Sequence, residues 1–327
     1  MIRPTRILII RLSSMGDIVL TTPVIRRLKL QLEGETEIHF LTKKSFVPLL
    51  ESNPYISKIH AMDKTVMEVV PELMELEFDY IIDLHNNIRS RIVKRKLKSL
   101  AFTFDKLNIK KWLWVNLGIN KMPNVHVVDR YLDAIGAFST EDDQKGLDYF
   151  IPEGTSIERF TLPENYIAFA IGGAHVGKRM DAEKLISLCK KTNHPIVLLG
   201  GKDDTETAQK IKESVPDVIN LCGELSIHES ALAVKNARLV ISGDTGLMHI
   251  ASAFTKKIIS LWGCTVPGLG MYPYRPNEHS VMLEPHGRSK RPCSKLGNKC
   301  KYGQNNRCIQ QIDELEIQGA IETLWTN

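Results

Sequence analysis

The 327-residue sequence contains no run of 18 apolar residues, which is about the shortest length that spans a bilayer as a helix. The opening residues, Met1 to Arg6, lead into an apolar strand and do not have the pattern of an export signal. Three of the six cysteines, Cys189, Cys222 and Cys264, fall in or beside predicted core elements, where a thiol behaves as a small apolar group. These features exclude a membrane-spanning protein and predict a cytoplasmic one.

The sequence also lacks a common zinc-binding spacing. Cys293, Cys300 and Cys308 are separated by six and seven residues, whereas structural zinc sites pair their ligands two to four residues apart. Even with His286 included, no such pair exists among them. We therefore expect no metal site and no cofactor.

A dinucleotide fingerprint is absent from the first strand–helix connection. A buried strand is predicted from Arg6 to Arg11, and the loop from Leu12 to Asp17 contains one glycine, Gly16. A nicotinamide-binding loop would show Gly-x-Gly-x-x-Gly, so a dehydrogenase is disfavoured. The loop instead offers the hydroxyls of Ser13 and Ser14 and the Asp17 carboxylate at the carboxyl end of the strand.

Strands and helices alternate twice along the chain, which predicts an α/β protein with two doubly wound, Rossmann-like domains. A polar segment from Ser139 to Pro163 is predicted to link them. We expect an N-terminal domain over residues 1–150, a C-terminal domain over 160–310 and a final helix within 311–327. The expected strands lie at 6–11, 38–41, 56–61, 80–84, 166–171, 196–199, 218–221, 239–241 and 257–261, and the expected helices at 20–32, 45–51, 68–76, 125–138, 182–191 and 227–235, with another opening at Gly200 to Glu206.

The strand from Tyr80 to Leu84 is followed by polar residues that belong at the same sheet edge as Asp17. They are His85, Asn86 and Arg89. Ligands of open α/β sheets bind outside the carboxyl ends of the strands. The sequence therefore places a candidate binding rim in the first domain.

The stretch from Arg238 to Ala253 predicts a buried strand, a tight turn and a helix. Asp244 is suited to cap this helix, while Thr245 and Gly246 leave first-turn amides for an anionic ligand. An aspartic protease needs two such carboxylates in an all-β setting, and this chain has one Asp-Thr-Gly triplet, before a helix. Lys178 supplies a point charge suited to a diphosphate. The alternatives are that Asp244 is only a helix cap and that Lys178 is an ordinary surface lysine.

Positive charge is concentrated between Arg89 and Lys111. This window holds nine Lys or Arg and one Asp, a charge of +8, so the remainder of a chain with net charge +5 carries 5 − 8 = −3. Trp112 and Trp114 follow it. A solvated helix face is one interpretation, and nucleic acid is disfavoured because no binding motif accompanies the charge. Anionic lipid headgroups fit better, because tryptophan prefers the bilayer interface.

These stretches together resemble glycosyltransferase family 9, the lipopolysaccharide heptosyltransferases. The matching segments are Ser13–Asp17, Ile82–His85 with Arg89 and Ser90, Gly172–Ala174 with Lys178 and Arg179, Gly243–His249, Trp262–Pro267 and the late cysteines. The resemblance implies a GT-B architecture of two facing Rossmann-like domains with a cleft between them and metal-independent inverting transfer. It also implies that a last helix, Asp313 to Trp325, crosses back to the first domain.

The resemblance assigns expected roles. Asp17 is the catalytic base; the donor-binding residues are Lys178, Glu206, Leu225, Asp244, Thr245, Gly246 and His249; and the acceptor-binding residues are Ser13, Ser14, Gly16, His85, Asn86 and Arg89. Within the donor set, Lys178, Thr245 and Gly246 hold the diphosphate, Asp244 and His249 bind the sugar or order its loop, Glu206 reaches the ribose and Leu225 touches the base.

The expected partners are an ADP-heptose-like nucleotide sugar, a lipid-linked saccharide acceptor of the lipopolysaccharide core and the inner membrane surface on its cytoplasmic side. No nucleic acid and no obligate protein partner are expected. The alternatives are a non-catalytic protein that binds a sugar nucleotide or an anionic lipid and, less favoured, a nucleotide-dependent oxidoreductase. A binding protein would not need Asp17.

Overall fold

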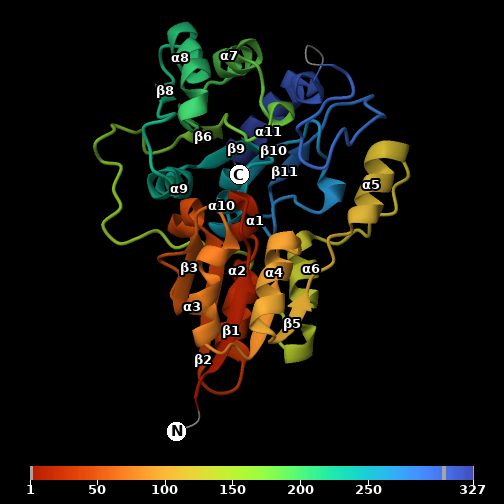
Figure 1. Ribbon diagram of the computed structural model, residues 1–327. Helices are drawn as coiled ribbons and strands as arrows, with labels where there is room; N and C mark the ends of the chain where they lie inside the picture. Colours follow the sequence, from red (N-terminus) through yellow and green to blue (C-terminus); the bar gives the residue numbers. More distant parts are fainter. Residues whose placement is uncertain (1–2, 304–306, 327) are drawn as a thin grey trace. The chain divides into compact units, whose positions relative to one another are not determined.

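The computed structural model describes residues 3–303 and 307–326. The chain forms two compact units. Unit 1 comprises residues 1–106 and 125–152, and unit 2 comprises 107–124 and 153–327. Each unit contains one parallel sheet (Figure 1). The predicted α/β class with two doubly wound domains is therefore confirmed.

Unit 1 has a five-stranded sheet in the order β3-β2-β1-β4-β5. Its strands are β1 (Thr5–Ile10), β2 (Thr36–Lys43), β3 (Lys58–Met62), β4 (Tyr80–Asp83) and β5 (Leu100–Thr103). The first strand is central and pairs in parallel with β2 and β4, so that Ile10 lies opposite both Leu41 and Asp83. Four consecutive residues of β1, from Ile7 to Ile10, are fully buried, as expected for a strand covered on both faces.

The helices of unit 1 are α1 (Met15–Val19), α2 (Thr22–Gln31), α3 (Val70–Glu75), α4 (Ile88–Leu97) and α6 (Val127–Asp133). Contacts join α3 to α4 and α2 to α6. The helix predicted from residue 20 to 32 is α2, with Pro23 in its first turn, and the short helix α1 before it was not predicted. The predicted helix at 45–51 is instead a 3₁₀ segment, Lys44–Leu49, which contains Pro48; proline cannot donate a helical hydrogen bond.

Unit 2 has a six-stranded sheet in the order β11-β10-β9-β6-β7-β8. Its strands are β6 (Ile167–Ala170), β7 (Ile196–Leu199), β8 (Ile219–Asn220), β9 (Leu239–Gly243), β10 (Lys257–Leu261) and β11 (Val281–Leu283). Its helices are α5 (Asn108–Leu117), α7 (Ala182–Lys191), α8 (Thr205–Ser214), α9 (Ile227–Asn236), α10 (Gly246–Ala253) and α11 (Glu314–Thr326). One apolar core joins α7, α8 and α11 to the sheet, while α9 packs against α10.

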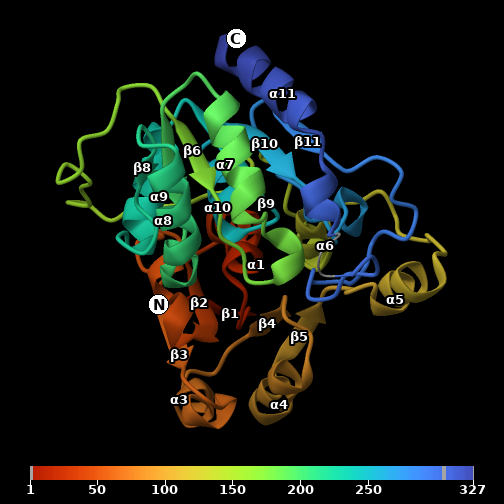
Figure 2. The same cartoon turned by 90° about the horizontal axis from the view of Figure 1, so that it is seen from above.

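The last helix, α11, packs on unit 2, where it contacts α7 and the strands β9, β10 and β11 (Figure 2). That it crosses back to the first domain stays a prediction. Ile317, Ile321 and Leu324 are buried in the same core as the sheet. These three positions are spaced by four and three residues and therefore form one apolar helix face.

The domain limits also differ from those predicted. Residues 107–124, which include α5, belong to unit 2, although they lie within the stretch assigned to the first domain. Trp114 packs against Gly268, where an added Cβ would lie 2.7 Å from the indole. The basic window of Arg89 to Lys111 is thus divided between the two units and is not one surface of one domain.

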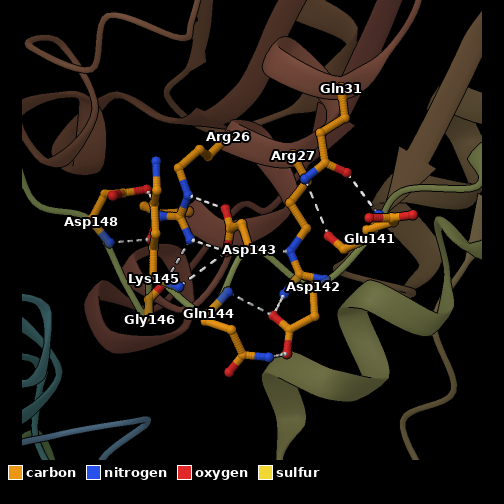
Figure 3. A network of polar contacts seen from close by, with 11 residues as sticks. Arg26, Arg27, Gln31, Glu141, Asp142, Asp143, Gln144, Lys145, Gly146 and Asp148 are labelled. Carbon is orange, nitrogen blue, oxygen red and sulfur yellow. Dashed lines mark hydrogen bonds and ion pairs between the residues drawn. The ribbon is translucent and has the colours of Figure 1, made fainter.

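The first part of the predicted linker is anchored to unit 1 by ion pairs. Arg26 of α2 is 1% exposed and pairs with Asp143 (Nε to Oδ2, 2.6 Å) and with Asp148. It also donates to the carbonyl oxygen of Gly146 at 2.9 Å. The neighbouring Arg27 pairs with Asp142 (Figure 3). Acidic residues that the sequence assigned to a polar linker therefore neutralise two buried arginines of α2.

None of the helices within residues 3–303 and 307–326 is both long enough and apolar enough to cross a membrane.

Candidate functional site

The strand order of unit 1 changes direction beside β1. The chain proceeds outward from β1 to β2 and β3, and then returns to the other side of β1 for β4 and β5. Loops at such a switch point diverge above the carboxyl ends of the strands and leave room for a ligand. The loop after β1 and the first turn of α1 carry Ser13 to Asp17, and the loop after β4 carries His85 and Asn86.

The Asp17 carboxylate is held in place from two sides. Its Oδ1 lies 2.6 Å from Nη2 of Arg11, and its Oδ2 accepts hydrogen bonds from the Ser14 hydroxyl at 2.8 Å and the Ser14 amide at 3.2 Å. Arg11 also donates to the carbonyl of Leu84 and, at 2.8 Å, to the hydroxyl of buried Tyr131. A guanidinium with several fixed acceptors is a rigid support for the carboxylate.

This surrounding keeps Asp17 ionised. Burial by itself raises the pKa of the carboxyl group, but the positive charge of Arg11 and the hydrogen bonds from Ser14 outweigh burial and lower the pKa of Asp17 to about 2. The side chain remains 18% exposed. It is thus an oriented carboxylate that carries its charge at neutral pH and is still accessible.

His85 lies close enough to Asp17 to interact electrostatically with it. Burial and the charges of Arg11 and Lys106 lower the pKa of His85 to about 4, so the imidazole is neutral at pH 7. Its Nδ1 is buried and has no hydrogen-bond partner among the described residues. His85 therefore adds an uncharged polar group beside the carboxylate.

The loop after β4 is shaped by Asp83. Its Oδ1 accepts from the backbone amides of His85 and Asn86 at 3.1 and 2.7 Å, and its Oδ2 pairs with Lys94 at 2.8 Å. Asn86 has a positive φ of 46°, a conformation that asparagine tolerates better than most residues, and its side-chain amide donates to Phe104. Asn86 thus has a structural contact in addition to its predicted role.

The remaining predicted residues of unit 1 lie around the same loops. Ser13 accepts a hydrogen bond from Arg11 through its carbonyl, Ser14 precedes α1, and Gly16 is buried within α1. Arg89 is exposed in the first turn of α4. The structure places all six acceptor candidates on the two loops that flank the switch point or on the first turns of the helices that follow them, and their roles stay predictions.

Unit 2 has its own switch point between β6 and β9. The loop after β6 carries Gly172 to Lys178, and the loop after β9 carries Asp244 and Thr245. Lys178 Nζ lies 2.7 Å from Asp244 Oδ2, and Thr265 donates to the same oxygen at 3.1 Å. The predicted donor residues Lys178 and Asp244 are therefore brought together as an ion pair.

The helix that follows begins one residue later than the capping argument expected. Thr245, not Asp244, is the residue before the first turn of α10, and its hydroxyl lies 2.9 Å from that of Ser242. Asp244 is instead committed to Lys178 and Thr265. The first amides of α10, beginning at Gly246, have no acceptor within the helix and carry the positive end of its dipole.

His249 lies one turn further along α10 and is 1% exposed. A residue buried to this degree orders its surroundings more readily than it reaches a soluble ligand. Of the two roles expected for His249, ordering the loop is the one that its burial favours.

Two other predicted donor residues lie further along the sheet edge. Glu206, in the first turn of α8, is 83% exposed and pairs with Lys210 at 2.7 Å. Leu225 is half-buried just before the Ser226 cap of α9. Both are accessible, and their contacts with ribose and base stay predictions.

Sequence reasoning missed the residues that hold the candidate groups in place. Arg11 reads as the polar end of a strand, and Tyr131 as an aromatic core residue, yet both position Asp17. Thr265 and Ser242 likewise orient Asp244 and Thr245. The one local signal available was Arg11, a cation directly after the four-residue apolar run from Ile7 to Ile10.

The model of the family described as glycosyltransferase family 9 (heptosyltransferase) matches residues 66–301. The chain is 25% identical to lipopolysaccharide heptosyltransferase 1 of Campylobacter coli over an alignment that covers 98% of this chain and 99% of the relative. Sequence likeness to this relative thus extends over both units.

Solved structures show the same fold. The glycosyltransferase family 9 protein of Veillonella parvula superposes with a TM-score of 0.78 at 22% identity and covers 98% of this chain and 97% of its own. The Escherichia coli ADP-heptose LPS heptosyltransferase II has a TM-score of 0.74 at 18% identity, with 98% of each chain covered. The expected GT-B class, with a Rossmann-like sheet in each domain, is thereby confirmed. Because the family model matches most of its length, the chain belongs to glycosyltransferase family 9, the heptosyltransferases.

Proposed function

We propose that this glycosyltransferase moves a heptose from ADP-heptose to a saccharide of the lipopolysaccharide core, with inversion at the anomeric carbon. Family membership supports the transfer reaction. The donor and acceptor classes follow from the names of the relatives, which are lipopolysaccharide heptosyltransferases, one of them named for ADP-heptose. The reaction needs a group that receives a proton and groups that accept the charge of the leaving diphosphate.

Asp17 is the proton acceptor in this proposal. The acceptor hydroxyl attacks the anomeric carbon, the bond between that carbon and the diphosphate oxygen breaks, and the hydroxyl proton passes to Asp17. A carboxylate with a pKa of about 2 is a weak base, so proton transfer follows C–O bond formation, when the attacking oxygen has become strongly acidic. Asp17 then passes the proton to solvent.

Lys178 and the start of α10 stabilise the departing ADP. The side chain of Lys178 is 16% exposed, and Asp244 fixes the position of its ammonium group, which a phosphate can approach. Free amides at a helix N-terminus favour a phosphate by hydrogen bonding and by the helix dipole. Together they supply positive charge where the leaving group gains negative charge.

The observation that carries this proposal is the pair of switch-point sites. One presents an oriented, ionised carboxylate, and the other presents a cation beside a helix N-terminus. A protein that only binds a sugar nucleotide would need the second site and not the first. The carboxylate therefore favours a transferase over the binding-protein alternative.

Peripheral attachment to an anionic membrane surface belongs to the same proposal, and α5 with the turn after it is the segment that supports it. Ile109, Trp112, Leu117 and Ile119 are between 45% and 77% exposed. Lys110 is exposed beside them. Apolar and aromatic side chains flanked by lysine fit the interfacial layer of a bilayer that carries negative charge.

The proposal is tested with the purified chain, ADP-heptose and deacylated core oligosaccharides that lack heptose. The expected result is ADP release that depends on the oligosaccharide, a product heavier by one heptose and an anomeric configuration opposite to that of the donor. UDP- and GDP-sugars serve as donor controls. Binding of ADP-heptose without consumption, across the whole acceptor panel, would support the binding-protein alternative instead.

A further inference from the structure

Four of the six cysteines meet at one point in unit 2. We call Cys264, Cys293, Cys300 and Cys308 the cysteine cluster. The sulfurs of Cys264, Cys293 and Cys300 all lie within 4.8 Å of one another, and the Cys293 sulfur is also in contact with that of Cys308. Three members are buried and Cys300 is half-buried.

Ordinary core packing does not explain this arrangement. The two cysteines outside the cluster, Cys189 and Cys222, lie among aliphatic side chains of the main core. Cysteines of the cluster instead face one another. Two disulfides would separate them into two pairs, whereas Cys293 contacts all three other sulfurs and the thiols are free.

The spacing agrees with a tetrahedral metal centre. With metal–sulfur bonds of about 2.3 Å, the sulfurs of a tetrathiolate site lie about 3.8 Å apart. Three sulfurs that lie mutually within 4.8 Å need to move by an ångström or less to reach that separation. These three sulfurs are thus already close to the separation found around a bound metal, and Cys308, whose sulfur contacts that of Cys293, is the candidate for the fourth ligand.

Groups around the cluster are suited to stabilise a thiolate centre. The backbone amide of Lys301 donates to the Cys293 sulfur. Arg291 donates to the carbonyls of Trp262, Gly263 and Thr265 on either side of Cys264, at 2.6 to 3.0 Å. Four thiolates around a divalent ion carry a net charge of −2, and amide donors and nearby cations offset that charge.

We propose that the cysteine cluster binds one Zn²⁺ ion as a structural tetrathiolate site. Four sulfur ligands are typical of structural zinc, which has no open position for substrate. The site takes no part in the transfer chemistry. Local spacing did not reveal it because Cys264 comes from the loop after β10, remote in sequence from the other three.

The site lies next to the segment that carries Lys178. Gly177 donates to the carbonyl of Gly297 at 3.0 Å, and the amide of Cys264 donates to the carbonyl of Gly177 at 3.4 Å. An added Cβ at Gly297 would lie 3.0 Å from the Lys178 stem. A metal that joins Cys293 and Cys300 closes the loop containing Gly297 and so fixes the support of Lys178.

Metal analysis of the full-length protein, purified under reducing conditions without chelator, tests the proposal. We expect one zinc per chain by elemental mass spectrometry and four sulfur neighbours at about 2.3 Å by X-ray absorption. Cys293→Ser and Cys300→Ser are expected to lose the zinc. The matched controls Cys189→Ala and Cys222→Ala, which change buried cysteines elsewhere in the same unit, are expected to keep it.

A second measurement applies if the serine variants fail to fold. Titrating the wild-type thiols with a mercurial in the presence of a zinc indicator should release the zinc as the cluster thiols react, with a fall in Tm. A metal-free protein, a mass showing two disulfides, iron in place of zinc, or zinc retained by both serine variants would each overturn the proposal. Metal content does not depend on donor or acceptor, so this result stands apart from that of the transfer assay.

Discussion

Replacing Asp17 by asparagine separates the catalytic role of this carboxylate from its structural role. Asparagine preserves the size of the side chain and can still accept from Ser14, but it cannot take up a proton or neutralise Arg11. Loss of a positioned general base slows a reaction by roughly 10²- to 10⁴-fold. We expect kcat to fall by that factor while the dissociation constant of ADP-heptose is unchanged, because the proposed donor residues belong to unit 2.

The same substitution has a predictable cost in stability. The pKa of Asp17 falls from 3.8 to about 2 in the folded protein, and a shift of this size corresponds to about 2 kcal/mol of stabilisation at neutral pH. Because the folded pKa lies below the unfolded value, the stabilisation is complete above the unfolded pKa and is lost as the pH falls towards the folded one. The difference between wild type and variant should therefore shrink between about pH 5 and pH 2.

Two assays measure these effects. ADP release at saturating donor and acceptor gives kcat, and urea unfolding at a series of pH values gives the difference in unfolding free energy. Asp79→Asn is the matched control: Asp79 pairs with Arg3 at 2.7 Å and also has a lowered pKa, but it immediately precedes β4, at the opposite end from the switch-point loops. The control should lose stability and keep its turnover.

Wild-type turnover in Asp17→Asn would remove Asp17 from the mechanism. Equal losses of turnover in Asp17→Asn and Asp79→Asn would instead attribute the effect to destabilisation of unit 1. A stability difference that does not change between neutral and acid pH would refute the assignment of the low pKa to Asp17.

The remaining predictions concern three other sites. Lys178→Met and Asp244→Asn should each weaken ADP-heptose binding, and the double variant should lose less than the sum, because the two side chains form one ion pair; additive losses in calorimetry would contradict a shared role. Arg26→Met should destabilise unit 1 by about 3–5 kcal/mol, since it leaves Asp143 and Asp148 without their buried cation, whereas Lys58→Met, which breaks an exposed pair with Glu72, should cost about 1 kcal/mol or less in urea unfolding. Lys110→Glu with Trp112→Ser should reduce sedimentation with acidic vesicles at low salt while the exposed Lys190→Glu on α7 does not; equal sedimentation of all three proteins would leave α5 as an ordinary solvated surface. The same vesicle assay applies to the exposed basic residues of α4, which are Arg91, Arg95 and Lys96. Lys94 is left unchanged in that variant because it pairs with Asp83.

Local sequence patterns were sufficient for most strands and helices. Continuous apolar runs identified the buried parallel strands β7 and β10 at their observed limits, and helical spacing did the same for α7. The same patterns placed Asp17, Lys178 and Thr245 at sheet edges, because ligand loops follow the strands in this class of fold.

Those local patterns could not predict contacts between residues that are far apart in the sequence. Nothing near Arg26 in the sequence indicates that Asp143 and Asp148 neutralise it, and the short strand β5 lies in a window whose charge suggested a helix surface. Lys94 read as part of a solvated basic face, yet it pairs with fully buried Asp83. Each of these contacts depends on residues brought together by the tertiary fold, which neither spacing nor propensity encodes.

The excursion of residues 107–124 out of unit 1 has a consequence for how the protein is made and divided. The chain passes between the units three times, so α5 leaves the ribosome long before Gly268 and Lys301, which pack against Trp114 and bind the carbonyl of Val115. A fragment that ends at Pro152 would present this helix with its apolar side uncovered. Exchanging a whole unit with a relative therefore requires three junctions in the gene, and a single cut after the first sheet would divide a folding unit.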